Sequence, residues 1–464
     1  MIKRLVSAAL CIAIIFSLVA CGAAASNPAT NAPTTAPAAQ AAAATDAPTQ
    51  KPAEAAPKEE AVKATLTIAI WDNLVNDLYQ QLDIQSRFQK LYPNVDIEVE
   101  KIKNDSEYWD AMKIRASANE LPDLMFNKTF TLAQFKDYLI DLGGTEASKN
   151  NNLASAYSVG GKVLGIPQTM TTEYVFYWQD MFDEAGVAVP TTWPAFLEAT
   201  EKLQAHFEPE NPDFMAIALG AKDEWPTYPF VEFMPALQNG DGFNWDSMAK
   251  LEEPFASGSN MNLTYNKIYE LFSKPVFGRD PNGIGHDQAV ALFAQKRAAI
   301  IVSGSWCLDT IQQGTDDVST LKTFYLPVRD AESEPFRIIA QGDSFLGVTI
   351  HSQNQPIAVD FVEFYFSDAW YRDYINSIPD DGTVDEFAKA KTPALQIADD
   401  TEPKDKTLVM YDGGGDDFQS LVNETKFDYK KLGAEMFVDG FDLQKRFDDL
   451  NAAWKSARAK LGVK

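Results

Sequence analysis

The chain has 464 residues, enough for two or three domains, and its 45% hydrophobic and 12% aromatic residues can build sizeable cores. Its formal net charge of −26 argues against nucleic-acid binding, because such a chain has no basic field to attract phosphates. The three histidines are far apart, and the sequence has no zinc-protease, serine-hydrolase or Walker A motif. We therefore expect no metal, no cofactor and no catalytic residue.

The N-terminus has the pattern of an export signal. Lys3 and Arg4 precede an apolar run, residues 5–20, that is short for a membrane span. Small residues end the run immediately before Cys21, which resembles the bacterial lipobox, whose cysteine becomes diacylated. We expect residues 1–21 to be a lipoprotein signal peptide and Cys21 to carry acyl chains such as palmitate, since two chains anchor stably. The alternative is an ordinary cleaved signal peptide with an incidental cysteine.

The next segment, residues 22–63, is composed mainly of Ala, Pro and Thr and has almost no large apolar side chain. Such a segment cannot bury enough surface to offset its ordering entropy, so we expect a disordered tether. The tether would hold a folded domain, residues 64–464, away from a membrane. Cys307 is the one cysteine in that domain, so we expect no disulfide framework and a buried thiol.

The folded part begins with alternating strands and helices. Residues 64–70, 95–100 and 121–126 are rich in β-branched and apolar residues and are expected to be strands. Residues 76–91 and 108–118 are expected to be helices between them. This order predicts βαβ units and a largely parallel sheet.

Two of these strands are followed by residues suited to ligand binding. Trp71, Asp72 and Asn73 follow the first strand, and Phe126, Asn127 and Lys128 stand at the end of the third. In parallel sheets, ligands bind beyond the carboxyl ends of the strands. We therefore expect these six residues to lie at a site.

The most detailed pattern lies in residues 165–196. An aromatic strand, residues 173–178, leads into a short amphipathic helix that Gly186 ends. Thr192 then stands at an N-cap position, with proline in the first turn of the next helix.

This order resembles family 1 extracellular solute-binding proteins, the sugar-binding components of ABC importers that are similar to maltose-binding protein. The matching residues of the segment are Tyr177, Asp180, Phe182, Ala185, Gly186, Pro190, Thr192, Trp193 and Phe196. Further matching segments are residues 88–99, 122–124, 161–167 and 432–461. Residues 288–307 and 341–350 resemble the family's second and third crossings between lobes, so the resemblance covers about residues 64–464.

The resemblance implies an α/β, two-lobed periplasmic-binding-protein-like fold of type II. Hinge-linked lobes would each have a central mixed sheet flanked by helices. We expect the first lobe to comprise about residues 64–171 and 299–345. The second lobe would comprise about residues 172–298 and 346–464.

The expected ligand-binding residues fall into two groups. The resemblance implies ligand contacts at Trp71, Phe126, Glu173 and Trp306. Placement alone suggests Asp72, Asn73, Asn127, Tyr177, Trp225, Trp245 and Asp343. Aromatic residues could stack on sugar rings, although core packing is the commoner role for any one of them, and the acids could instead cap helices or lie on the surface.

Two further loops bear on the site. Gly304 precedes Trp306 and would allow the backbone to approach a ligand closely, which makes Trp306 the leading stacking candidate. Residues 411–417 contain three glycines and three aspartates, but their spacing does not match an EF-hand calcium loop. We expect a solvated glycine loop near the mouth of the cleft.

The leading hypothesis is a monomeric, lipid-anchored binding protein, not an enzyme, on the extracellular (or periplasmic) side of the membrane. It would close on a sugar by hinge motion and deliver it to ABC permease subunits. A secreted glycoside hydrolase is the first alternative, because its carboxylate pair could lie among the 66 acidic residues. A sensory solute-binding lipoprotein is the second. A polyol, polyamine or phosphodiester ligand also stays open.

Overall fold

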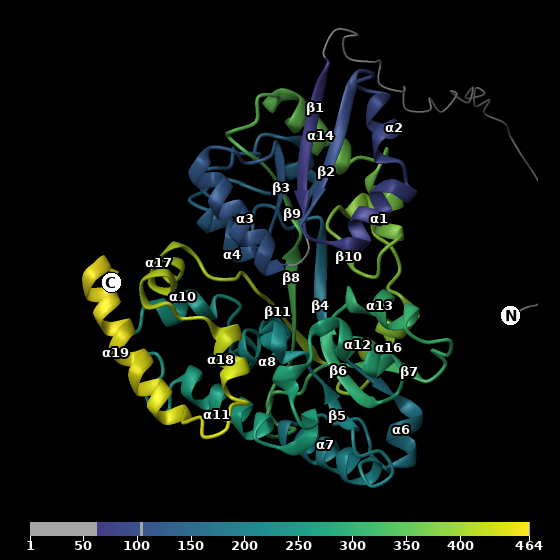
Figure 1. Ribbon diagram of the computed structural model, residues 1–464, viewed down its shortest axis with the longest axis vertical. Coiled ribbons are helices and arrows are strands. Elements are labelled where there is room, and N and C mark those ends of the chain that lie inside the picture. The colour runs from purple at the N-terminus through teal and green to yellow at the C-terminus, as the bar shows by residue number, and fades with distance from the viewer. Residues whose placement is uncertain (1–62, 103–104, 464) are drawn as a thin grey trace, which may run out of the picture. The chain divides into compact units, whose positions relative to one another are not determined.

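The first sheet has four strands in the order β2-β1-β3-β9 in the computed structural model, which describes residues 63–102 and 105–463 (Figure 1). The bounds are β1 (Ala64–Ile70), β2 (Val95–Lys101), β3 (Leu124–Asn127) and β9 (Phe345–Val348). β1 pairs in parallel with β2 and β3, as predicted, and β9 pairs antiparallel with β3. The carboxyl ends of β1 and β3 therefore lie at one edge of the sheet.

Short helices and one longer helix pack with this sheet. They are α1 (Asn73–Gln81), α2 (Ile84–Gln89), α3 (Asp105–Ala118), α4 (Thr129–Gln134), α5 (Glu146–Asn150), α14 (Gln355–Tyr365) and α15 (Tyr371–Asn376). Together they form one hydrophobic core. The core joins segments that are distant in sequence, since the Tyr79 hydroxyl donates a hydrogen bond of 3.2 Å to the Tyr365 hydroxyl. We call this unit the first lobe.

The second sheet has seven strands and is organised around β4. Its main order is β11-β8-β4-β6-β5, and β7 and β10 also pair with β4. The bounds are β4 (Thr169–Trp178), β5 (Met215–Ala218), β6 (Ala298–Gly304), β7 (Leu321–Phe324), β8 (Phe336–Asp343), β10 (Asp381–Gly382) and β11 (Lys406–Met410). β4 is buried along nearly its whole length, which explains why residues 174–178 are apolar or aromatic on both faces.

The helices around the second sheet include the predicted pair after β4. Thr192 accepts a hydrogen bond from the backbone N–H of Ala195 and caps α7, as expected. The α-helices are α6 (Gln179–Glu184), α7 (Trp193–Phe207), α8 (Tyr228–Val231), α9 (Met234–Asn239), α10 (Asn244–Ala249), α11 (Asn260–Phe272), α12 (His286–Ala294), α13 (Cys307–Gln313), α16 (Pro393–Asp400), α17 (Asp416–Thr425), α18 (Tyr429–Glu435) and α19 (Leu443–Leu461). Short 3₁₀ turns in this unit are η1 (Ala221–Asp223), η2 (Trp225–Thr227), η3 (Pro275–Phe277) and η4 (Pro281–Gly283), whereas η5 (Asp385–Phe387) packs with the first core. We call this unit, with its own core, the second lobe.

The chain changes lobes just before β4, between β8 and β9, and after residue 387. This differs from the expected boundaries. Residues 299–343 pack in the second lobe, and residues 346–387 pack in the first, apart from β10, which pairs with β4 in the second sheet. The segment 288–307 is not a crossing, because β6 pairs along its length with β4 and β5 inside the second core. An apolar strand that ends in glycine has the same sequence pattern whether it crosses between lobes or lies within one lobe.

The predicted signal peptide, the tether and Cys21 lie outside the described residues. Within residues 63–102 and 105–463, no helix combines the length and the apolar character that crossing a bilayer requires.

Candidate functional site

The first lobe places Trp71 and Asp72 between β1 and α1. The Asp72 carboxylate accepts hydrogen bonds from the backbone N–H groups of Leu74 (2.8 Å) and Val75 (3.3 Å), so it caps α1. Burial raises the pKa of Asp72, and those two hydrogen bonds act against the rise. Asp72 thus has the helix-capping role that sequence analysis left as its alternative. The side chain of Asn73 lies outside the described part of the structure.

Trp71 is half-buried on an aromatic base. Its ring packs edge-on against Tyr108 (centroids 5.1 Å apart) and Phe126 (5.5 Å). Phe126 is fully buried and packs against the Trp71 ring, so it is not placed to touch a ligand. Asn127 is also buried, and its side-chain amide donates to the backbone carbonyl of Met125 (3.1 Å), which fixes the turn after β3. These two expected ligand contacts therefore have structural roles.

Lys128 was expected at the site from its position but was not among the expected ligand contacts. Its ammonium lies 5.1 Å from the centre of the Trp71 ring and 2.7 and 2.9 Å from the two carboxylate oxygens of Asp343. The ion pair is largely buried, and Asp343 ends β8 in the second lobe. The available signal was its position, since Lys128 directly follows the end of β3. Lys128 thus connects the Trp71 face to a residue where the chain changes lobes.

Glu173, in the middle of β4, is buried beside Tyr228. The Tyr228 hydroxyl donates to Glu173 (2.9 Å) and accepts from the backbone N–H of Gly304 (2.9 Å). The second carboxyl oxygen, Oε1, has no hydrogen-bond partner among the described residues, and the residue is 7% exposed. Burial raises the pKa of Glu173 to about 8, and the nearby acids Glu232 and Asp343 add to the rise. Glu173 is therefore mostly protonated at neutral pH and can donate a hydrogen bond.

Three half-buried rings, Trp225, His286 and Trp306, form an aromatic cluster next to this pair. The ring centroids of Trp225 lie 4.5 Å from His286 and 6.0 Å from Trp306. Trp225 also stacks on Tyr228 at 6.2 Å. Burial lowers the pKa of His286 to about 4, so its ring is neutral at physiological pH. The cluster presents partly exposed, uncharged rings, which suits the apolar face of a sugar.

Gly304 does not have the predicted role of letting the backbone approach a ligand. A side chain at residue 304 would place Cβ 2.4 Å from the indole nitrogen of Trp306. The glycine is therefore required to seat Trp306 itself, rather than to admit a ligand to the backbone.

Tyr177 and Trp245, two other expected contacts, lie in the core of the second lobe. Tyr177 is 3% exposed and packs against Phe182 and Phe324. Trp245 is fully buried and stacks on Tyr429, with centroids 4.9 Å apart. Both residues have the core role that sequence analysis weighed against ligand contact.

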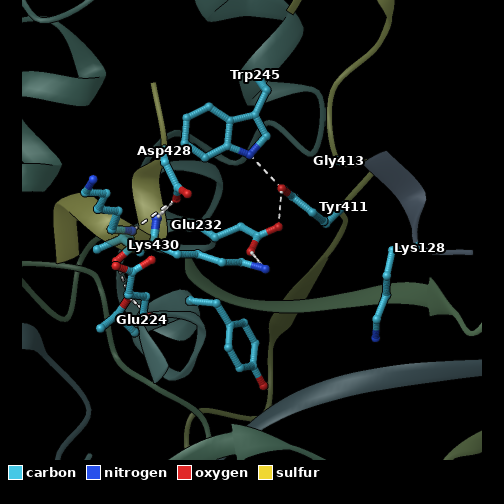
Figure 2. A network of polar contacts seen from close by, with 12 residues as sticks. Lys128, Glu224, Glu232, Trp245, Tyr411, Gly413, Asp428 and Lys430 are labelled. Atoms are coloured by element: carbon cyan, nitrogen blue, oxygen red, sulfur yellow. Dashed lines mark hydrogen bonds and ion pairs between the residues drawn. The ribbon is translucent and has the colours of Figure 1, made fainter. Parts of the chain in front are cut away.

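Trp245 also belongs to a buried polar network, which Figure 2 shows. Its indole N–H donates to the Tyr411 hydroxyl (2.6 Å), and that hydroxyl donates to Glu232 (2.8 Å). The Lys430 ammonium lies 3.7 Å from the other oxygen of Glu232. The network joins α10, α18 and the end of β11 and fixes the loop that follows β11.

Charge effects show that the two halves of the site converge on Asp343. Burial is the main cause of the raised pKa values of Asp72 in the first lobe and Glu173 in the second, and the Asp343 carboxylate adds to both. Asp380 belongs to the same group, because burial raises its pKa to about 7 and the Asp343 carboxylate adds to that rise, while Ser305 donates a hydrogen bond to it. The candidate site therefore draws on both lobes, with Trp71 and Lys128 on one side and Glu173 and the aromatic cluster on the other.

Two small cavities lie on the second-lobe side of the site. One is lined by Glu173 and the other by Trp225, Tyr228 and His286, and each measures about 10 Å³. Each has room for about one water molecule. The residues that line both cavities belong to the second lobe. Among the described residues, no group of histidine, cysteine and acidic side chains is arranged to hold a metal ion.

Comparisons with known proteins identify relatives of this chain. Residues 63–372 match the family model named "Bacterial extracellular solute-binding protein". The multiple sugar-binding protein of Streptococcus mutans is 22% identical over 291 residues, which cover 60% of this chain and 65% of that protein. The matched region thus spans less than two thirds of that relative's length.

Solved structures share the fold over most of the chain. The apo form of RafE from Streptococcus pneumoniae has a TM-score of 0.65 at 18% identity, over 86% of this chain and 100% of that one. The mannobiose complex of BlMnBP1 from Bifidobacterium animalis subsp. lactis has a TM-score of 0.70 at 18% identity, over 86% and 95%. The predicted α/β two-lobed fold, with mixed sheets flanked by helices, is confirmed.

Proposed function

The chain belongs to the family of bacterial extracellular solute-binding proteins, and we propose that it captures a carbohydrate between its two lobes. The ligand is an oligosaccharide or a related solute. The observation that carries the proposal is the aromatic cluster of Trp225, His286 and Trp306 beside protonated Glu173. Uncharged rings can stack on the C–H face of a pyranose, while a protonated carboxyl donates to a sugar hydroxyl.

The relatives support the choice of ligand class. One is named a multiple sugar-binding protein, and two of the solved structures are complexes with raffinose and mannobiose. Lys128 brings no surplus positive charge to the site, since it pairs with Asp343. A neutral ligand suits such a site better than an anion does.

Titration with saccharides tests the proposal. The intrinsic tryptophan fluorescence of the protein is measured against raffinose, mannobiose and longer oligosaccharides, with free reducing ends assayed in parallel. Because Trp225 and Trp306 are half-buried at the site, we expect a saturable signal change at micromolar ligand and no new reducing ends. No response to any saccharide would overturn sugar capture, and steady release of reducing ends would favour the glycoside hydrolase.

We further propose that Cys21 is lipidated and that the anchored protein delivers its ligand to an ABC permease as a monomer. The lipobox-like pattern before Cys21 and the family membership support this role. A Cys21→Ser variant is expected to leave the membrane fraction, because two acyl chains supply stable anchoring. Fractionation of expressing cells measures this. A variant that stays on the membrane would show that another segment anchors the chain.

A further inference from the structure

Two strands, β6 and β10, pair one after the other with the same edge of β4 (Figure 1). β6 pairs with residues 173–177 and β10 with residues 169–170, while β8 pairs with residues 169–172 along the opposite edge. Thr171 therefore lies where β6 has ended and β10 has not yet begun. We call this point, with Ser305, Trp306 and Asp380 beside it, the strand junction.

Asp380 is a buried carboxylate at the strand junction. The residue is 7% exposed, and the Ser305 hydroxyl donates a hydrogen bond to its Oδ1. The other oxygen, Oδ2, has no hydrogen bond or ion pair to any residue that the structure describes. Burial raises the pKa of Asp380 to about 7, so the group is about half ionised at neutral pH. One carboxylate oxygen is thus left to accept a hydrogen bond from a ligand.

The protein itself does not neutralise this carboxylate. The charge of Lys389 lowers the pKa of Asp380, but its ammonium donates to the backbone carbonyls of Ile375 (2.7 Å) and Ile378 and forms no ion pair with Asp380. The acids Asp343 and Asp381 act in the opposite direction and add to the rise in pKa. A buried carboxylate without a counterion favours a positive group supplied from outside the chain.

A hydroxyl and an aromatic ring stand next to Asp380. A side chain at Gly304 would place Cβ 2.4 Å from the Trp306 indole nitrogen and 2.7 Å from the Thr171 methyl carbon, so these two side chains meet over Gly304. The Thr171 hydroxyl is buried and lacks a hydrogen-bond partner within the described part of the chain. Burying such a group costs free energy unless a ligand or water completes it. The Trp306 ring is half-buried and keeps part of its face exposed.

We propose that the strand junction binds a protonated amino group, which makes the captured saccharide an amino sugar. This inference deepens the proposed function and rests on it. An ammonium group carries a positive charge and several N–H donors, which Asp380 Oδ2 and the Thr171 hydroxyl can accept while the Trp306 face attracts the cation. A sugar hydroxyl would leave the charge of Asp380 without a counterion. Glu173, two residues along the same face of β4, stays available for a hydroxyl of the same ligand.

Matched saccharides test the inference on the native full-length chain. Glucosamine, galactosamine and mannosamine are each titrated at pH 7 beside the parent hexose and the N-acetyl form, with intrinsic tryptophan fluorescence as the readout. The three sets differ in ring stereochemistry, and within a set the substituent at one carbon changes. We expect at least one amino sugar to bind about tenfold tighter or more than its parent hexose. The N-acetyl form, which keeps the nitrogen but has no charge, should show no such gain.

An Asp380→Asn variant assigns the preference to this carboxylate. Asparagine has the same size and can accept the Ser305 hydrogen bond, but it carries no charge, so the preference for the amino sugar should fall to less than about twofold. The matched control is Asp381→Asn, which removes the neighbouring acid of β10 and should leave the preference within about twofold of the native value. An equal fall in both variants would show a long-range charge effect and would overturn the assignment.

A pair of threonine variants covers the case in which Asp380→Asn does not fold. Thr171→Val and Thr172→Val each remove one hydroxyl from a buried residue of β4, but only the Thr171 side chain lies over Gly304. We expect the first to lower the preference for the amino sugar about threefold and the second to leave it unchanged. Identical effects of the two would count against the strand junction.

The outcomes also separate this inference from the proposed function. Binding of raffinose, mannobiose or a parent hexose, with no preference for any amino sugar, would overturn the inference and leave sugar capture standing. No binding of any saccharide would overturn both.

Discussion

A Glu173→Gln variant is expected to be more stable than the native protein by about 4 kcal/mol at pH 8 and by only about 1 kcal/mol at pH 5. Burial raises the pKa of Glu173 from 4.5 to about 8. In the unfolded chain this carboxyl loses its proton near pH 4.5, whereas in the folded protein it keeps the proton until about pH 8. The unfolded state thus binds fewer protons in this window, so the contribution of Glu173 to stability falls as the pH rises through it. Glutamine removes this penalty because it stays neutral.

The substitution keeps the geometry of the site. The amide oxygen of glutamine can accept the hydrogen bond that Tyr228 donates to Glu173 Oε2. Urea unfolding at pH 5 and pH 8 measures the free energy of unfolding of both proteins. Because both contain Asp380 and the other titrating groups, the effects of those groups cancel in the difference between the two proteins at each pH. Glu210→Gln, at an exposed position, is the matched control and should change the free energy of unfolding by less than about 0.5 kcal/mol at either pH. Equal effects of Glu173→Gln at the two pH values would mean that Glu173 does not titrate between them.

Local sequence patterns predicted the elements of the fold better than the assignment of segments to lobes. β1, β2 and β3 and the capped helix α7 follow from alternation, β-branched residues and the Thr192 cap, which act over a few residues. Lobe membership depends on pairing between distant segments. β6 pairs with β4, more than a hundred residues earlier, and nothing in its own sequence separates that pairing from a crossing.

The same limit applies to the site residues. Glu173 and Tyr177 lie on the same face of β4, about 13 Å apart along the strand, so one reaches the site and the other the core. The alternation that places both on one face cannot tell where along the strand the lobe ends. The position of Lys128 at the site was predicted, but its ion pair with Asp343 was not, because the two residues are 215 residues apart in sequence. Many other lysines and arginines could have taken that role equally well.

Removing the aromatic cluster is expected to weaken saccharide binding most. Trp306→Ala and Trp225→Ala should each raise the dissociation constant about thirtyfold to a hundredfold, because each indole offers a large apolar face for stacking, worth about 2–3 kcal/mol. Both rings are half-buried, and they lie at 6.0 Å from each other. Isothermal titration calorimetry with the saccharide selected by the fluorescence titration measures the change, since the fluorescence itself is altered in these variants.

Two comparisons separate stacking from a general loss of structure. Phe243→Ala removes a ring that is 55% exposed and lies outside the cluster, so the dissociation constant should change by less than about twofold. Trp306→Phe keeps an aromatic face above Gly304 and should restore most of the affinity lost in Trp306→Ala. Because Trp225 also stacks on Tyr228, which holds Glu173, Trp225→Ala should disturb both the ring face and the hydrogen-bond donor. Its loss of affinity should therefore be at least as large as that of Trp306→Ala. Unchanged binding in both alanine variants would place the saccharide elsewhere on the protein.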